Sequence, residues 1–152
     1  MSIFPVPDSK MVSDQEYRAS ATLPAAGAYA AGAKAEIVPF AEEVEVAASY
    51  VRGGVGGSFK VLVWWYLAGD EDTPFGHTYR DDAHATVADP IVTVDTFQFV
   101  LQGEAAGIAT AVRRLFPLKP PPSAIGVRLD VAEVGAVGTP GTLALRVVSR
   151  RG

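Results

Sequence analysis

Apolar and polar residues alternate along most of the chain after residue 36, with the period of two that is typical of half-buried β-strands. In residues 44–50, valine, alanine and tyrosine at the even positions alternate with glutamate, alanine and serine at the odd positions. The run FKVLVWWYL at 59–67 is apolar on both faces, which predicts a central strand whose outer face is also covered. We expect one face to carry Phe59, Val61, Val63, Trp65 and Leu67, and the other to carry Lys60, Leu62, Trp64 and Tyr66.

The second half of the chain continues this pattern. Residues 91–101 predict another strand, and residues 125–131 and 143–147 predict a C-terminal hairpin around the glycine-rich connection 133–141. Short strands between glycine- and proline-rich turns, without a long helical period, predict an all-β fold. We expect an antiparallel β-sandwich or jelly roll.

Two segments interrupt the strand pattern. Residues 68–76 are acidic and rich in turn-forming residues, and they predict a loop. Residues 108–115 fit either a short helix or an edge strand, and the prolines at 117 and 120–122 predict an end to regular pairing there.

The N-terminal residues 1–34 lack a large apolar stripe and contain three prolines and an alanine- and glycine-rich piece. We therefore predict two regions, an extended N-terminal arm at 1–34 and a β-sandwich domain at 35–152. Ordering an arm costs conformational entropy that it cannot offset on its own domain, so we expect it to order on a partner. Its candidate partner-binding residues are Ile3, Phe4, Val6, Met11, Val12 and Tyr17. A flexible terminus without a partner is the alternative.

Composition narrows the classes of function. With 152 residues, 49% of them hydrophobic and 20% charged, the chain is long enough for one globular domain. A net charge of −4 argues against a surface built to bind nucleic acid. The longest apolar stretch, residues 61–68, is far shorter than the roughly 20 residues of a membrane-spanning helix. With no cysteine, the chain has no disulfide, thiolate zinc site or cysteine nucleophile.

Three loops raise hypotheses of ligand binding or catalysis. The glycines of residues 52–57 suggest a phosphate-binding loop, but a strand-like run follows them where such a loop opens a helix. The acidic residues within 70–82 suggest calcium, although the spacing of a calcium-binding loop is missing. His77 and His84 suggest zinc or iron, although a bend would be needed to bring them together. No serine lies in a nucleophile elbow. We expect no enzymatic activity, no cofactor and no required metal.

The aromatic side chains support two binding hypotheses. Trp64 and Tyr66 on the outer face of the central strand, with Phe75 and Tyr79 nearby, suggest a stacking platform for carbohydrate. Alternatively, Trp64 and Tyr66 cover a contact between subunits. Arginine outnumbers lysine nine to four, which suits interface contacts.

Several segments resemble small tailed-bacteriophage virion proteins of jelly-roll type: LPAAGAY at 23–29, IVP at 37–39, SYVRGGVGGS at 49–58 with Trp64 downstream, and GVRLDVAEVG at 126–135 followed by GTPGTL at 138–143 and Arg146. The resemblance implies a capsid decoration (cement) protein or a tail-associated module. It implies a homo-oligomer, with a trimer favoured, that binds a major capsid or other virion protein. The chain would then be made in the host cytoplasm and act in the virion. The alternative is a carbohydrate-binding or tail-adhesion module that uses Trp64 and Tyr66.

Overall fold

The regular structure of the residues that the structure describes consists of β-strands. A computed structural model describes residues 11–25, 28–54, 57–76, 95–99, 112–134 and 139–152. The strands within these residues are β1 (Met11–Thr22), β2 (Tyr29–Ala30), β3 (Ala35–Glu36), β4 (Glu43–Val51), β5 (Ser58–Leu67), β6 (Asp70–Gly76), β7 (Asp95–Phe99), β8 (Val112–Leu118), β9 (Ala124–Val134) and β10 (Thr142–Arg151). In this part of the chain, no helix has the length and apolar character needed to cross a membrane.

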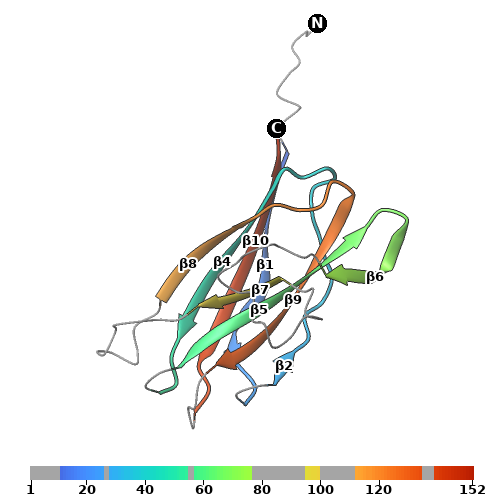
Figure 1. Ribbon diagram of the computed structural model, residues 1–152. Coiled ribbons are helices and arrows are strands. Elements are labelled where there is room, and N and C mark those ends of the chain that lie inside the picture. Colours follow the sequence, from blue (N-terminus) through green and yellow to red (C-terminus); the bar gives the residue numbers. More distant parts are fainter. Residues whose placement is uncertain (1–10, 26–27, 55–56, 77–94, 100–111, 135–138) are drawn as a thin grey trace, which may run out of the picture.

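The strands form two antiparallel sheets that face each other as a sandwich (Figure 1). The first sheet has the order β1-β10-β4-β8. The second has the order β2-β9-β5-β6, and in it β3 also pairs with β9 and β7 with β5. The first strand lies beside the last, and the chain crosses repeatedly from one sheet to the other. This arrangement of antiparallel strands is a jelly roll, which confirms the predicted fold class.

The hydrophobic core lies between the two sheets and follows the alternation seen in the sequence. Every even-numbered residue of β4 from Val44 to Tyr50 is buried. In β5, the residues at 59, 61, 63 and 65 are at most 2% exposed, as their predicted inward face requires. Strand β5 is central in the second sheet. Strand β9 pairs with one of its edges and β6 with the other, at residues 64–67, while β7 pairs with residues 59–63.

The predicted boundary between arm and domain is wrong for residues 11–34. Strand β1 pairs with β10 from Met11↔Arg151 to Thr22↔Thr142, and β2 pairs with β9. Leu23 is 2% exposed and belongs to the core. The sequence of this segment has few large apolar residues because β1 is an edge strand with much of its surface facing solvent. Residues 1–10, the rest of the predicted arm, lie outside the described residues.

The predicted C-terminal hairpin is also wrong. Strand β9 belongs to the second sheet and β10 to the first, so these two strands face each other across the core. Both alternate apolar and polar residues because each has one face on the core, and this requirement is the same whether or not the strands pair with each other.

The described parts of the two segments that interrupted the strand pattern are strands, and residues 108–111 lie outside the described residues. Residues 70–76 form β6, which makes a hairpin with β5 through Ala68 and Gly69. Gly69 adopts a positive φ of 92°, a conformation that glycine reaches without steric cost. Residues 112–118 form β8 at the edge of the first sheet, and Pro117 lies within that strand opposite Glu45. A proline is tolerated there because an edge strand does not need all of its N–H groups for pairing.

Candidate interaction surface

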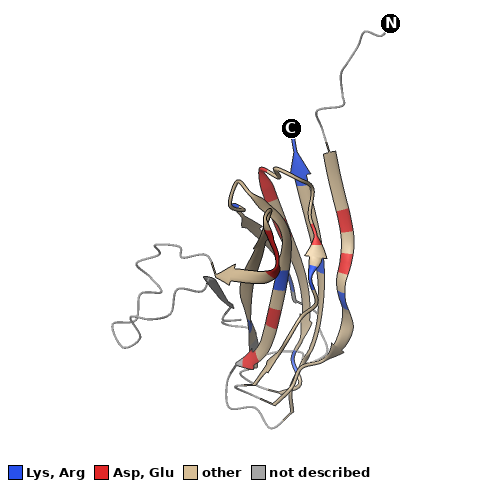
Figure 2. Cartoon of the chain, turned by 90° about the vertical axis from the view of Figure 1, so that its right-hand side faces the viewer, with Lys and Arg blue, Asp and Glu red and all other residues tan. Residues whose placement is uncertain are grey.

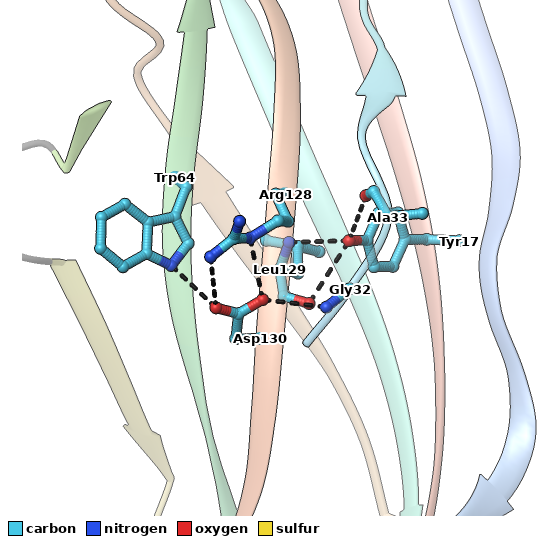
Figure 3. A network of polar contacts seen from close by, with 7 residues as sticks. All are labelled: Tyr17, Gly32, Ala33, Trp64, Arg128, Leu129 and Asp130. Carbon is cyan, nitrogen blue, oxygen red and sulfur yellow. Dashed lines mark hydrogen bonds and ion pairs between the residues drawn. The ribbon is translucent and has the colours of Figure 1, made fainter. Parts of the chain in front are cut away.

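The outer face of the second sheet carries a network of polar contacts centred on Asp130 (Figure 3). The Trp64 indole Nε1 donates to Asp130 Oδ2 at 3.0 Å. The Arg128 guanidinium donates to both carboxylate oxygens, with its Nε 3.1 Å from Oδ1 and its Nη2 3.0 Å from Oδ2. The backbone N–H of Gly32 completes the set at 2.9 Å from Oδ1. Asp130 is only 6% exposed, and these donors satisfy the buried carboxylate.

Strand pairing places these side chains. Trp64 on β5 lies opposite Arg128 on β9, and both point away from the core because their neighbours Val63 and Leu129 point into it. The Arg128 guanidinium carbon lies 5.2 Å from the centroid of the Trp64 ring, which is a cation–π contact. The indole is therefore held at its N–H and across its face by residues of the same chain.

Two further cation–π contacts lie on this sheet. Lys34 Nζ lies 4.9 Å from the centroid of the Tyr66 ring, and it also donates to the backbone oxygen of Glu71 at 3.0 Å. Lys60 Nζ lies 5.1 Å from the centroid of the Tyr29 ring. The segment that contains β2 and β3 thus covers part of the outer face of the second sheet.

Tyr17 connects the two sheets at the side where β1 and β9 approach each other (Figure 3). Its hydroxyl donates to the backbone oxygen of Ala33 at 2.6 Å and accepts the backbone N–H of Leu129 at 2.8 Å. Burial raises the pKa of Tyr17 to about 12. A Cβ atom added to Gly32 would overlap both the Tyr17 hydroxyl and the Leu129 oxygen, so only glycine fits at this crossing.

Tyr50 and Glu133 form a second connection between the sheets, inside the core. The Tyr50 hydroxyl lies 2.9 Å from each Glu133 carboxylate oxygen, and both residues are at most 1% exposed. The backbone N–H of Gly141 lies 3.4 Å from Glu133 Oε1. Burial raises the pKa of Glu133, although the hydrogen bonds from Tyr50 and Gly141 oppose the shift. Burial and the neighbouring carboxylate raise the pKa of Tyr50 in turn.

The predicted interface residues fall into four groups. Met11 and Val12 are 40% and 67% exposed, so both remain available to a partner. Tyr17 and Tyr66 are not, because Tyr17 binds its own domain and Tyr66 is only 6% exposed. Trp64 keeps a partly exposed ring. Ile3, Phe4 and Val6 lie outside the described residues.

The structure tests the ligand-binding hypotheses in part. Within the described residues, no three His, Asp or Glu side chains lie close enough to hold a metal ion. Asp70, Glu71 and Asp72 lie along β6 and are exposed. The remaining acidic residues of 70–82, together with His77 and His84, lie outside the described part of the chain.

Sequence reasoning missed the residues that fix Trp64. Arg128 and Asp130 are two residues apart on one strand, so they share a face, and this spacing was a usable signal. The role of Gly32 depends on a contact with a residue 98 positions away. No local pattern carries that information.

The strand order defines the chain as a jelly-roll β-sandwich. No family model and no curated protein sequence matches the chain. Solved structures do match. A chain in the structure of the Gx strain of infectious bursal disease virus aligns with a TM-score of 0.56 and 12% identity over 99% of this chain. The VP2 subviral particle of the same virus aligns with a TM-score of 0.47 and 11% identity over 95% of this chain.

The chain spans little more than a third of the viral chains that it matches, 36% of the first and 38% of the second. At these identities the likeness shows a shared fold. The neighbours come from a virus that is not a tailed bacteriophage, so the phage origin suggested by the sequence has no support from the comparisons.

Proposed function

We propose that this chain is a non-enzymatic structural component of a virion that acts through contacts with other virion subunits. The observation that carries this proposal is the jelly-roll strand order, which aligns over 99% of the chain with a protein of an infectious bursal disease virus structure. The local chemistry agrees with such a role. Trp64, Asp130 and Arg128 use their polar groups on one another, which builds a rigid surface for contact.

Within this role, we propose a capsid decoration or cement protein that forms a homo-oligomer and binds a shell of major capsid protein. Exposed Val12 and Leu115, at 67% and 63%, supply apolar contact area on the first sheet. Ile3, Phe4 and Val6 remain proposed anchors for a neighbouring subunit. The chain would be made in the host cytoplasm and incorporated into the particle.

Reconstitution tests this function. Purified chain is added to preformed shells that lack it, and bound copies and the shell's melting temperature are measured by sedimentation and calorimetry. We expect stoichiometric binding and a higher melting temperature for the decorated shell. A chain that builds closed particles alone would be a principal shell subunit instead. A chain that neither self-associates nor binds shells would contradict the virion role.

Carbohydrate binding remains the alternative function. Trp64 does lie on the outer face of the second sheet, as that hypothesis requires. However, Arg128 stacks on the Trp64 ring and Tyr66 is buried, so the two aromatic rings do not form one open platform. Assembly is therefore the better-supported use of this surface.

A further inference from the structure

The first sheet has two edge strands that no other strand covers within the described residues. The order β1-β10-β4-β8 places β1 at one edge and β8 at the other. Each pairs with a single inner strand, β1 with β10 and β8 with β4. An open strand edge presents unpaired N–H and C=O groups, and these are satisfied well by another strand.

Strand direction makes these two edges complementary. All pairs in the first sheet are antiparallel and the sheet has four strands, so β1 and β8 run in opposite directions. A second copy in the same orientation, placed beside the first, therefore presents its β1 antiparallel to β8. The alternation of the sheet continues across such a contact without interruption.

The open parts of the two edges are similar in length. Arg18 donates from Nη1 to the Ala21 oxygen at 3.0 Å and from Nη2 to the Thr22 oxygen at 3.3 Å, so its side chain occupies the end of β1. Register shifts between Glu16 and Arg18 and between Arg18 and Ala21 also distort that end. The regular part of β1 is thus residues 11–16. In β8, Pro117 limits the regular part to residues 112–116, because proline lacks an N–H.

The charges of the two edges are opposite. Strand β1 carries Asp14 and Glu16 on its regular part, both exposed, and Figure 2 shows acidic bands along this strand at the margin of the sandwich. Strand β8 carries Arg113 and Arg114, also exposed. Opposite charges favour the approach of β8 to β1 of another copy, and like charges disfavour pairing of β1 with β1 or β8 with β8.

One register satisfies both the apolar and the charged residues. Pairing Leu115 with Val12 of the next copy also places Arg113 beside Asp14 of that copy, because antiparallel pairing moves two residues along each strand in opposite directions. The faces agree as well. Val12 and Asp14 lie opposite Arg150 and Val148, while Leu115 and Arg113 lie opposite Ala47 and Ser49. These four partners all lie on the outer face of the sheet.

We propose that copies of this chain join head to tail through the first sheet, with β8 of one copy paired antiparallel to β1 of the next in the register Leu115↔Val12. This inference rests on the self-assembly part of the proposed function and names the surface that performs it. The contact is heterologous, so it closes into a ring or continues as an open chain of copies.

Cysteine cross-linking tests the contact directly, because the natural chain contains no cysteine. A mixture of Val12→Cys and Leu115→Cys chains, treated with a short bismaleimide, should give a cross-linked dimer. Each variant alone should give none. The control is Ala21→Cys mixed with Leu115→Cys, since Ala21 is exposed on β1 but lies outside the proposed register. Cross-linking of Val12→Cys with itself would show a two-fold β1–β1 contact and overturn the proposal.

Charge reversal gives an independent readout in the full-length chain. Arg113→Glu should raise the dissociation constant for self-association by about fivefold at low salt. The control, Lys60→Glu, reverses a charge on β5 of the second sheet, away from both edges of the first sheet, and it should leave association unchanged. Equal effects of Arg113→Glu and Lys60→Glu would overturn the edge contact.

The two proposals fail differently. If the chain self-associates or binds shells but the Val12–Leu115 cross-link is missing, the edge contact is wrong and the virion role stands. If the chain stays monomeric at high concentration and binds no shell, both are wrong.

Discussion

The Tyr50 hydroxyl and the Glu133 carboxylate meet in the interior of the sandwich, with 2.9 Å between the hydroxyl oxygen and each carboxylate oxygen. Tyr50 belongs to β4 of the first sheet and Glu133 to β9 of the second. A carboxylate buried in a hydrophobic core is costly unless its oxygens are hydrogen-bonded. The pair therefore stabilises one relative position of the two sheets, because sliding would separate the carboxylate from its donor.

The stability of the fold should depend on pH through Glu133. Because burial raises its folded pKa above the ordinary value of 4.5, its contribution to stability is greatest below that value and is lost as pH rises through the folded pKa. The difference in unfolding free energy between the natural chain and Glu133→Gln should therefore shift in favour of the natural chain as pH falls from 8 to 5. Urea unfolding at several pH values measures this, and parallel profiles would contradict it.

Tyr50→Phe should destabilise the fold more than Glu133→Gln does at neutral pH. The first change leaves a buried carboxylate without its main donor, at a cost of about 1–3 kcal/mol or more, while the second removes the charge. Chemical denaturation at pH 7 compares the two variants directly. A Tyr50→Phe chain as stable as the natural one would show that the pair does not hold the sheets together.

Tyr17→Phe should lower the free energy of unfolding by about 1–3 kcal/mol, because it leaves the backbone N–H of Leu129 without its acceptor. The matched control is Tyr29→Phe, which removes a hydroxyl from a partly exposed ring and should change stability by less than about 0.5 kcal/mol. Equal stability of the two variants would show that Tyr17 does not tie β1 to the second sheet.

Gly32→Ala should destabilise the chain by about 1–3 kcal/mol, because the added methyl group overlaps the Tyr17 hydroxyl and the Leu129 oxygen. Combining it with Tyr17→Phe relieves only the first overlap, so the double variant should stay less stable than Tyr17→Phe alone. Thermal unfolding of the three variants measures the coupling. Full recovery in the double variant would show that the Leu129 oxygen moves freely.

Two N-terminal truncations should have opposite effects. Removal of residues 1–10 should leave the melting temperature of the isolated chain nearly unchanged and lower its occupancy on a shell, since Ile3, Phe4 and Val6 are proposed to bind a neighbour. Removal of residues 1–22 should destabilise the chain strongly, since it deletes β1 and the Tyr17 contacts. Circular dichroism melts and shell-binding assays measure the two effects. Unchanged shell binding after the shorter truncation would remove the anchor role of residues 1–10.

Trp64 separates the two binding hypotheses. Trp64→Ala should leave the sandwich folded and weaken its association with subunits, while a glycan array with the natural chain should show no ligand. Trp64→Phe is the matched variant, since it keeps an aromatic ring for Arg128 but removes the N–H that binds Asp130, at a cost of about 0.5–1.5 kcal/mol. Reproducible glycan binding that Trp64→Ala abolishes would favour the carbohydrate alternative.

The sequence predicted the faces of the strands better than their neighbours. The alternation in 44–50 and 59–67 correctly assigned which residues enter the core, because one buried face demands apolar residues at every second position. The same alternation led to a hairpin for residues 125–147, although β9 and β10 lie in different sheets. The acidic sequence of 68–76 predicts a loop, but residues 70–76 form β6, because a short exposed hairpin strand does not need apolar residues.

The candidate surface divides in the same way. The sequence placed Trp64 and Tyr66 correctly on one face of the central strand. It did not show that Lys34, far away in the chain, covers Tyr66, or that Asp130 and Arg128 hold Trp64. Burial of a side chain on an outer face depends on which distant segment crosses it, and each such crossing is a separate long-range contact.

The sequence by itself determined the all-β fold class, because only paired strands bury the alternating residues of 44–50 and 59–67, while glycines and prolines interrupt helices. The tertiary structure alone decided that β1 lies beside β10, at the opposite end of the chain, and that Tyr17 reaches Leu129. The physical reason is that a period of two specifies which face of a strand is buried. The partner of each strand edge depends instead on backbone hydrogen bonds, and these are chemically the same for every strand.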